Sequence, residues 1–203
     1  MLTYQDLDQY KKAFIFELDN VLYPERDYLL QVYYLFANLL EYTETVPPAT
    51  DLAAFFKRAY EHHGADGIFE RAIDAFEIDE KYRENFNRIH VSAKLPLPLL
   101  MFSEVEKLLQ EILDNKKQIF MLTRGNPLMQ LNKIKQLNWG ALGKAVKVYF
   151  YDELVLRGYQ EPLLHLLQEN GLHITDVLVF GAGNTNDLSR LGIDYLAIDT
   201  LLK

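Results

Sequence analysis

The sequence predicts an α/β protein in which a parallel five-stranded sheet is covered by helices on both faces, with a bundle of helices inserted after strand one. Two observations carry this prediction. Five short apolar runs alternate with amphipathic stretches over most of the chain, which is typical of strands joined by crossover helices. In addition, about 70 residues between the first two apolar runs contain only helical patterns, far more than a crossover requires.

The expected strands are short and almost purely apolar, as strands of a parallel sheet are when both faces are buried. They are Ala13–Leu18, Gln118–Leu122, Val146–Phe150, Val177–Phe180 and Tyr195–Ile198.

Four amphipathic stretches between or after these runs predict the covering helices: Ser103–Lys116, a helix that begins at Asn126–Pro127, Pro162–Asn170 and Asn184–Leu191. Ser103 with Glu106 predicts a capping box. Asn126 is expected to cap the next helix, and Pro127 suits its first position, where an N–H has no helical partner. The basic residues Lys133 and Lys135 are expected on a solvated helix face.

The inserted segment predicts a second domain. Apolar residues recur at helical spacing in four stretches: Tyr28–Tyr42, Leu52–Tyr60, Ile68–Phe76 and Lys81–His90. We therefore expect residues 1–22 and 95–203 to form the α/β core and residues 23–94 to form a helical cap.

Composition limits the possible partners. The 203 residues carry a formal net charge of −8 and include no cysteine. The negative charge argues against a nonspecific nucleic-acid or anionic-membrane surface, and the missing cysteines exclude disulfides and thiolate chemistry. The polar N-terminal residues differ from a targeting peptide, and no apolar run is long enough to span a bilayer. We expect a cytoplasmic protein, and its protein partners remain unknown.

Polar residues follow three of the expected strands. Glu17 and Asp19 follow the first strand, the run Thr123-Arg124-Gly125 follows the second, and Asp187 lies in a glycine-rich turn after the fourth. Because ligands of open parallel sheets bind beyond the carboxyl ends of the strands, we expect these side chains around one pocket. Tyr23 is placed where it could face the same cleft.

These residue types suit phosphate chemistry. The carboxylates of Glu17, Asp19 and Asp187 could hold Mg²⁺, and the first two could also act as nucleophile and acid/base. Thr123, with the amides of Arg124 and Gly125, could hold phosphoryl oxygens at a helix N-terminus. Simpler interpretations remain open: Thr123 could cap backbone amides, Asp187 could be a first-turn helix acid, and Arg124 a solvated loop residue.

In sequence order, the segments FELDNVLYP, LTRGNP and FGAGNTND resemble the first, second and fourth motifs of the haloacid dehalogenase-like hydrolase superfamily. The resemblance covers essentially the whole chain and is strongest to members with a helical (C1) cap after strand one. It implies a three-layer Rossmann-like core with strand order 3-2-1-4-5. It also implies a Mg²⁺-dependent phosphatase acting on a small phosphomonoester, such as a nucleotide.

The chain departs from the family pattern at three positions. Glu17 replaces the nucleophilic aspartate, and its extra methylene moves the carboxylate by roughly 1.5 Å. Ala182 replaces an acid of the fourth motif, and Tyr159 stands where the third-motif lysine is expected. Arg157 is the nearest cation, but a guanidinium differs in shape from an ammonium.

Two functions therefore remain open. In the first, the chain is a weak Mg²⁺-dependent phosphatase in which Asp19 acts as acid/base, Glu17 acts toward the metal or phosphorus, and Thr123 holds the phosphate. In the second, it is a pseudoenzyme that uses the same cleft to bind a ligand or a protein. The altered positions favour the second, because they are those for covalent attack, metal binding and charge neutralisation.

Overall fold

The chain divides into two compact units in the computed structural model, which describes residues 3–183, 188 and 190–202. The core unit consists of Met1–Glu25, Leu99–Gln130 and Leu137–Lys203. The helical unit consists of Arg26–Pro98 together with Leu131–Gln136. Within the described residues, no helix combines the length and apolar character needed to cross a membrane.

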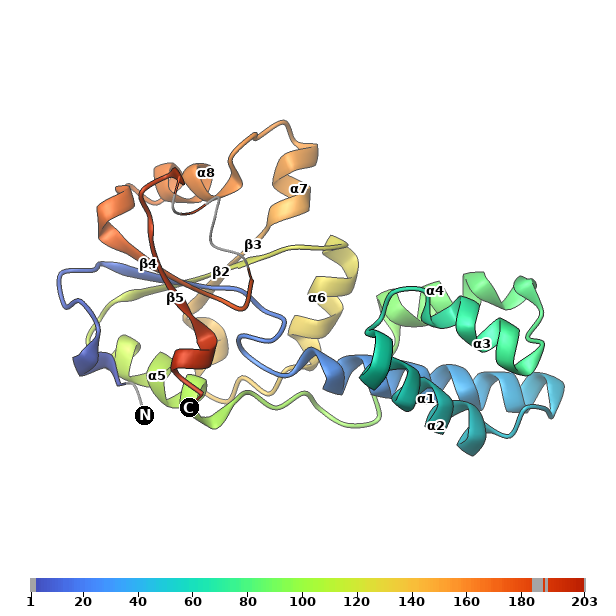
Figure 1. The fold of residues 1–203 in the computed structure, drawn as a ribbon. Coiled ribbons are helices and arrows are strands. Elements are labelled where there is room, and N and C mark those ends of the chain that lie inside the picture. The colour runs from blue at the N-terminus through green and yellow to red at the C-terminus, as the bar shows by residue number, and fades with distance from the viewer. Residues whose placement is uncertain (1–2, 184–187, 189, 203) are drawn as a thin grey trace. The chain divides into compact units, whose positions relative to one another are not determined.

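The core unit contains a parallel sheet of five strands in the order β3-β2-β1-β4-β5 (Figure 1). The strands are β1 (Ala13–Phe16), β2 (Gln118–Thr123), β3 (Val146–Phe150), β4 (Val177–Gly181) and β5 (Asp194–Ala197). The fold class and the strand order predicted from the sequence are therefore confirmed, with strand ends shifted by three residues or fewer.

The central strand β1 has both of its faces buried. Ile15 is in register with Phe120 of β2 and Val179 of β4, and all four residues of β1 are buried. Successive side chains of a strand point to opposite faces. Ile15 accordingly packs in a cluster with buried leucines of α8 (Pro162–Glu169), whereas Phe16 stacks on Phe180 at a centroid distance of 4.5 Å.

Helices cover the sheet on both sides, as Figure 1 shows for α5 (Ser103–Asp114) and α8. The apolar stripe of α5 is buried, as its helical periodicity predicts. The chain also forms α6 (Pro127–Gln136) and a short helix directly after β3, α7 (Tyr151–Leu156), which was not predicted. The predicted helix Asn184–Leu191 lies largely outside the described residues.

One of the two predicted helix caps is confirmed and the other is wrong. The side-chain oxygen of Asn126 accepts the N–H groups of Leu128 at 2.9 Å and Met129 at 3.3 Å, as expected of an N-cap. Ser103 is instead the first residue of α5, and its hydroxyl donates to Glu104. The helix begins one residue too early for Ser103 to cap it. Phe102 takes the N-cap position instead, and the N–H of Phe102 donates to Leu22 O at 2.9 Å.

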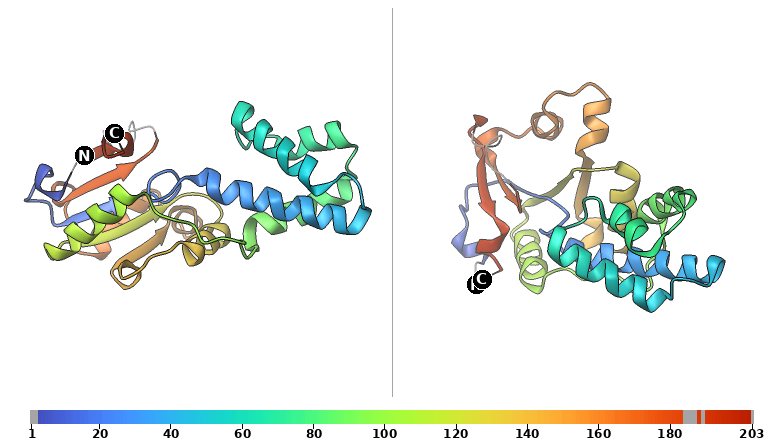
Figure 2. Two further views of the ribbon diagram at one scale, coloured as in Figure 1. Left: turned by 90° about the horizontal axis from the view of Figure 1, so that it is seen from below. Right: turned by 45° about the vertical axis from the view of Figure 1, so that its right-hand side comes forward.

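The helical unit contains four helices from one continuous segment, shown in two further orientations in Figure 2. They are α1 (Glu25–Glu44, whose first residue belongs to the core unit), α2 (Ala49–His63), α3 (Ile68–Phe76) and α4 (Arg83–Ser92). Their apolar faces meet in an aromatic cluster that we define as Phe36, Phe56, Phe69 and Phe86. Phe86 lies 5.0 Å from Phe36 and 4.8 Å from Phe69 between ring centroids.

Lys133, predicted to be solvated, is buried within the helical unit, with 1% of its surface exposed. Its ammonium lies 5.1 Å from the ring centroid of Tyr28. The prediction is wrong because a cation over an aromatic ring can be buried at lower cost than an isolated charge. Lys135, two residues further on, is exposed as expected.

Candidate active site

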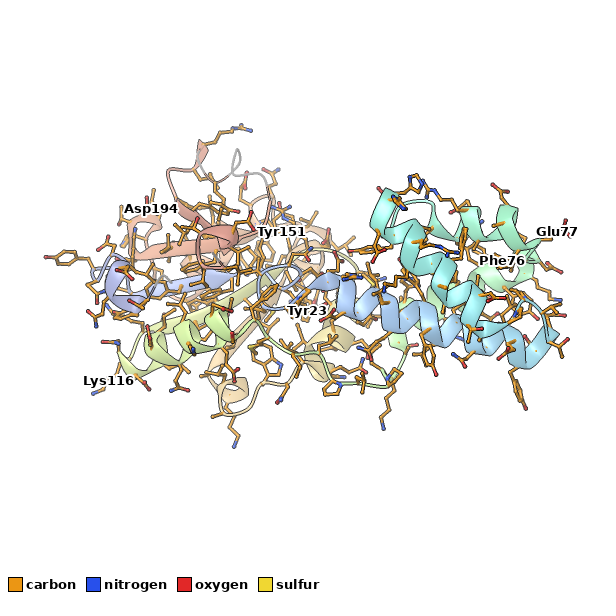
Figure 3. The ribbon with its side chains drawn as sticks, turned by 60° about the horizontal axis from the view of Figure 1, so that its bottom comes forward. Tyr23, Phe76, Glu77, Lys116, Tyr151 and Asp194 are labelled. Carbon is orange, nitrogen blue, oxygen red and sulfur yellow. The ribbon has the colours of Figure 1, made fainter. Side chains whose placement is uncertain are left out.

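A cavity of about 590 Å³ opens beside the carboxyl ends of the strands in the core unit. The lining combines polar residues, several of them from strand ends, with apolar residues from the sheet and α8. The lining includes Glu17, Asp19, Thr123, Arg124, Tyr151, Glu161, Leu163, Val179 and Arg190. In Figure 3, Tyr23 and Tyr151 lie at the end of the sheet opposite Asp194, the first residue of β5. Glu17, Asp19, Thr123 and Arg124 thus line one cavity, whereas Gly125 and Tyr23 are not among its lining residues. Asp187 lies outside the described residues.

The carboxylate of Glu17 is turned toward the end of β4. Its Oε2 accepts the backbone N–H of Ala182 at 3.1 Å. It also lies so close to Gly181 that a Cβ at that glycine would be 2.9 Å from the same oxygen. Because glutamate is longer than aspartate, the carboxylate of Glu17 reaches the turn after β4, where the family motif has an acidic residue. An aspartate at position 182 would bring a second carboxylate to this turn.

Asp19 is held through both of its carboxylate oxygens. Oδ1 accepts the hydroxyl of Tyr23 at 2.7 Å, and Oδ2 accepts Nε2 of Gln130 at 3.0 Å. Gln130 is 2% exposed and also donates to the carbonyl of Arg124 at 2.7 Å, while its own Oε1 is buried and has no hydrogen-bond partner among the described residues. Tyr23 is fully buried, so it reaches the site through Asp19.

The turn after β2 joins the cavity to the start of α6. Thr123 is buried and lines the cavity. The guanidinium of Arg124 lies 3.6 Å from the ring centroid of Tyr151. The N–H of Gly125 donates to the carboxylate of Asp152 at 2.5 Å, so an acid side chain stands where a phosphoryl oxygen was expected.

The two candidates for the lysine position have other contacts. Tyr159 is partly exposed and stacks on His165 at a centroid distance of 3.7 Å. Arg157 forms an ion pair with Glu153 one helical turn earlier. The described cations that line the cavity are instead Arg124 and Arg190.

Negative charge is prominent in the cavity lining, where Glu17, Asp19 and Glu161 stand against these two arginines. The negative charge of Glu17 also affects Tyr195 of β5. Burial, followed by the nearby charge of Glu17, raises the pKa of its phenol, and the hydroxyl donates to Gly183 O at 3.1 Å.

Among the described residues, Glu17 and Asp19 are the predicted magnesium ligands, and both line the cavity. Mg²⁺ requires octahedral oxygen coordination, usually with one or two carboxylates. Within the described part of the chain, no three His, Cys, Asp or Glu side chains gather closely enough to hold a metal. Asp19 accepts hydrogen bonds from Tyr23 and Gln130, Glu17 accepts one from the N–H of Ala182, and Ala182 has no side-chain ligand.

Sequence reasoning found the strand ends but missed Gln130, Tyr151, Asp152, Glu161 and Arg190. Gln130 lies inside a helix and Asp152 in a helix that was not predicted, and neither belongs to a local motif. The one available signal was the buried helix face that includes Gln130, where a polar residue needs hydrogen-bond partners.

Comparison with protein-family models and with curated proteins gives no match. Solved structures match over nearly the whole chain. The HAD-hydrolase YfnB from Bacillus subtilis, solved bound to magnesium, has a TM-score of 0.56 at 14% identity, over 91% of this chain and 85% of its own. A hydrolase from Streptococcus pneumoniae has a TM-score of 0.54 at 15% identity, over 93% of this chain and 92% of its own. The L-2-haloacid dehalogenase from Xanthobacter autotrophicus has a TM-score of 0.54 at 14% sequence identity, over 91% of this chain and 76% of its own.

These likenesses define the class of protein by its fold. The chain has the haloacid dehalogenase-like hydrolase fold, with a parallel core sheet and a helical unit inserted after strand one. The resemblance predicted from three strand-end segments is confirmed at this level.

Proposed function

We propose that this chain is a haloacid dehalogenase-fold protein that keeps a ligand cleft but has little or no phosphatase turnover. The ancestral activity was hydrolysis of a small phosphomonoester, such as a nucleotide, with Mg²⁺. One observation carries the proposal: the carboxylate at the nucleophile position, that of Glu17, is hydrogen-bonded to the backbone of Ala182 at the end of β4.

Covalent attack on phosphorus requires a nucleophile placed in line with the leaving group. An error of about 1 Å in such placement can lower a rate by around a hundredfold. Glu17 is longer than aspartate by one methylene, and its oxygen is seated against Gly181 and Ala182. Turning it toward a phosphate would break the hydrogen bond to Ala182.

The second catalytic position is also engaged. A general acid or base must exchange a proton with the reacting group within hydrogen-bond distance. In the structure Oδ1 of Asp19 accepts a hydrogen bond from Tyr23, and Oδ2 accepts one from Gln130. These donors hold Asp19 as an acceptor, which supports a binding or structural role for this carboxylate.

Charge neutralisation is weakened as well. A dianionic phosphate needs compensating positive charge in the site. Tyr159 supplies none, and Arg157 is paired with Glu153. Arg124 and Arg190 face three lining carboxylates, so the cavity disfavours a doubly charged anion.

The alternative is a weak phosphatase. It is favoured by one observation, namely that Glu17, Asp19 and Thr123 still line one cavity of about 590 Å³. In that case Mg²⁺ would be held by Glu17 and Asp19, with Asp187 as the third predicted ligand.

Phosphatase assays with Mg²⁺ and a generic aryl phosphate separate the two. We expect wild-type turnover near background, and no further loss in Glu17→Gln. The triple variant Glu17→Asp, Ala182→Asp, Tyr159→Lys restores the family groups and should raise turnover above both. Robust wild-type activity that Glu17→Gln abolishes would overturn the proposal in favour of the enzyme.

Thermal stability during a magnesium titration gives a second readout, because a ligand that binds only the folded state raises its stability by mass action. We expect little shift for the wild type and a larger upward shift for Ala182→Asp, which restores a carboxylate. A clear saturable shift in the wild type would show that a metal site survives.

A further inference from the structure

Part of the cavity wall is apolar. Four leucines line it, and we define them as the leucine wall: Leu122 of β2, Leu163 of α8, and Leu188 and Leu191 from the segment before β5. Leu122, Leu188 and Leu191 pack against the hydrophobic core but are only partly buried. Small-molecule pockets of this size are lined mainly by apolar groups, with a few polar groups that fix orientation. A ligand that covers the leucine wall therefore carries an apolar group.

Arg124 presents a positioned cation to the same cavity. Its guanidinium lies 3.6 Å from the ring centroid of Tyr151, and both residues line the cavity. Stacking on a ring uses the face of the planar guanidinium and leaves the N–H groups at its edge available to donate. Among the described residues, none accepts a hydrogen bond from this side chain. A fork of this kind is matched by a carboxylate, which accepts two parallel hydrogen bonds.

Glu17 presents a positioned anion to the cavity. Its Oε2 accepts the N–H of Ala182 at 3.1 Å, which fixes the carboxylate at the end of β4. No cation of the described part of the chain forms an ion pair with Glu17, and the same holds for Glu161, a second lining acid. A carboxylate in these surroundings is matched by an ammonium group, whose charged N–H donors make the stronger kind of hydrogen bond.

A ligand with one kind of charge satisfies only half of this lining. A simple amine meets Glu17 but adds a second cation to the cavity that holds Arg124. A simple carboxylic acid meets Arg124 but adds a further anion beside Glu17. A zwitterion meets both groups, and the cavity volume of about 590 Å³ lies within the range of pockets that enclose small molecules.

We propose that the cavity binds a free apolar α-amino acid, with its carboxylate on Arg124, its ammonium on Glu17 and its side chain against the leucine wall. This inference rests on the proposed function, because it names the class of ligand that the retained cleft takes. A zwitterion has no net charge, so it avoids the penalty that the lining carboxylates impose on a doubly charged phosphate.

The first test is calorimetry on the full chain with free leucine and three analogues that each lack one group. Isocaproate lacks the ammonium, isoamylamine lacks the carboxylate, and glycine lacks the apolar side chain. We expect saturable binding of leucine, and we expect each analogue to bind at least about tenfold more weakly, equivalent to about 1.4 kcal/mol. Absence of saturable leucine binding would overturn the inference, as would an analogue that binds as tightly as leucine.

Variants at the two charged residues assign each contact. Arg124→Gln keeps N–H donors and loses the charge, so it should weaken leucine binding about tenfold without weakening isoamylamine. Glu17→Gln should weaken leucine binding by a similar factor without weakening isocaproate. Arg157→Gln is the matched control, because Arg157 pairs with Glu153 and is not among the lining residues. It should bind leucine like the wild type.

Equal losses for leucine and for the analogue that lacks the matching group would contradict the assigned contacts and overturn the inference. If a variant does not fold, the analogue series on the wild type decides the question. Robust phosphatase turnover together with leucine binding would overturn the proposed function alone. Background turnover without leucine binding would overturn this inference alone, so the two failures are distinguishable.

Discussion

The strand ends of the core unit and the aromatic cluster of the helical unit are stabilised by different kinds of contact. At the strand ends, polar groups meet partners that are remote in sequence, with 111 residues separating Asp19 from Gln130 and 165 separating Glu17 from Ala182. In the helical unit, rings from four helices of one continuous segment pack together. Apolar spacing in the sequence therefore predicts packing, whereas polar pairing depends on the assembled fold.

The largest expected effect is in the aromatic cluster. Phe86 is 6% exposed and contacts the other three rings. Phe86→Ala should lower the free energy of unfolding by about 3–5 kcal/mol through lost burial and the cavity left behind. Urea denaturation followed by far-UV circular dichroism measures this loss.

Tyr42→Ala is the control within the same unit, since Tyr42 is 90% exposed. Its effect should stay within about 0.5 kcal/mol. Equal losses in the two variants would contradict the assignment of Phe86 to the centre of the cluster.

An intermediate effect is expected at the strand ends. Gln130→Glu replaces the amide donor with a second carboxylate beside Asp19, which should cost about 3 kcal/mol or more. Gln130→Met removes the donor together with the buried Oε1 and should cost less, about 1–3 kcal/mol. Denaturation of both variants at neutral pH tests the order. A Glu variant as stable as the Met variant would show that the added carboxylate is not repelled by Asp19.

The smallest effect concerns pH and lies at the margin of the aromatic cluster. Burial lowers the pKa of His90 and the charge of Lys133 adds to this, while the hydrogen bond to the Phe86 carbonyl opposes both. The unfolded chain then takes up a proton near about pH 6.5 that the folded chain resists. Stability should therefore fall as pH drops below that value, by at most about 1.4 kcal/mol per pH unit.

Replacement of His90 isolates this proton. His90→Gln cannot be protonated, so its stability should change less than that of the wild type between about pH 6.5 and pH 5. The carboxyls whose pKa is lowered, such as Glu70 and Asp79, lose their contribution only at more acidic pH. Identical slopes in the two proteins would exclude His90 as the source.

Most of the fold could be predicted from the sequence because its main signals are local. Runs such as Val146–Phe150 match the observed strand at both ends, and Ile68–Phe76 matches a helix at both ends. Asn126–Pro127 correctly predicted a helix start because cap and helix are adjacent in sequence. Ser103 failed because the position of its helix also depends on a hydrogen bond from Phe102 to the loop after β1.

Less of the candidate site could be predicted. The strand ends that carry Glu17, Asp19 and Thr123 follow from topology, since parallel strands end at the same edge. Their hydrogen-bond partners cannot be predicted from topology. Gln130 and Asp152 lie in α6 and α7, and they reach this edge of the sheet only once those helices have packed. A sequence pattern records which polar groups are present, and the tertiary structure decides which of them pair.

The close approach of Gly181 to its neighbours has a consequence for how this sequence can change. A methyl group at position 181 would lie 2.9 Å from Glu17 Oε2 and 2.9 Å from Tyr195 Cε2. Alanine at position 181 therefore becomes acceptable only after both neighbouring side chains have been shortened or moved. Variation of position 181 alone therefore requires both side chains to shift, whereas joint variation of positions 17, 181 and 195 relieves the overlap at once.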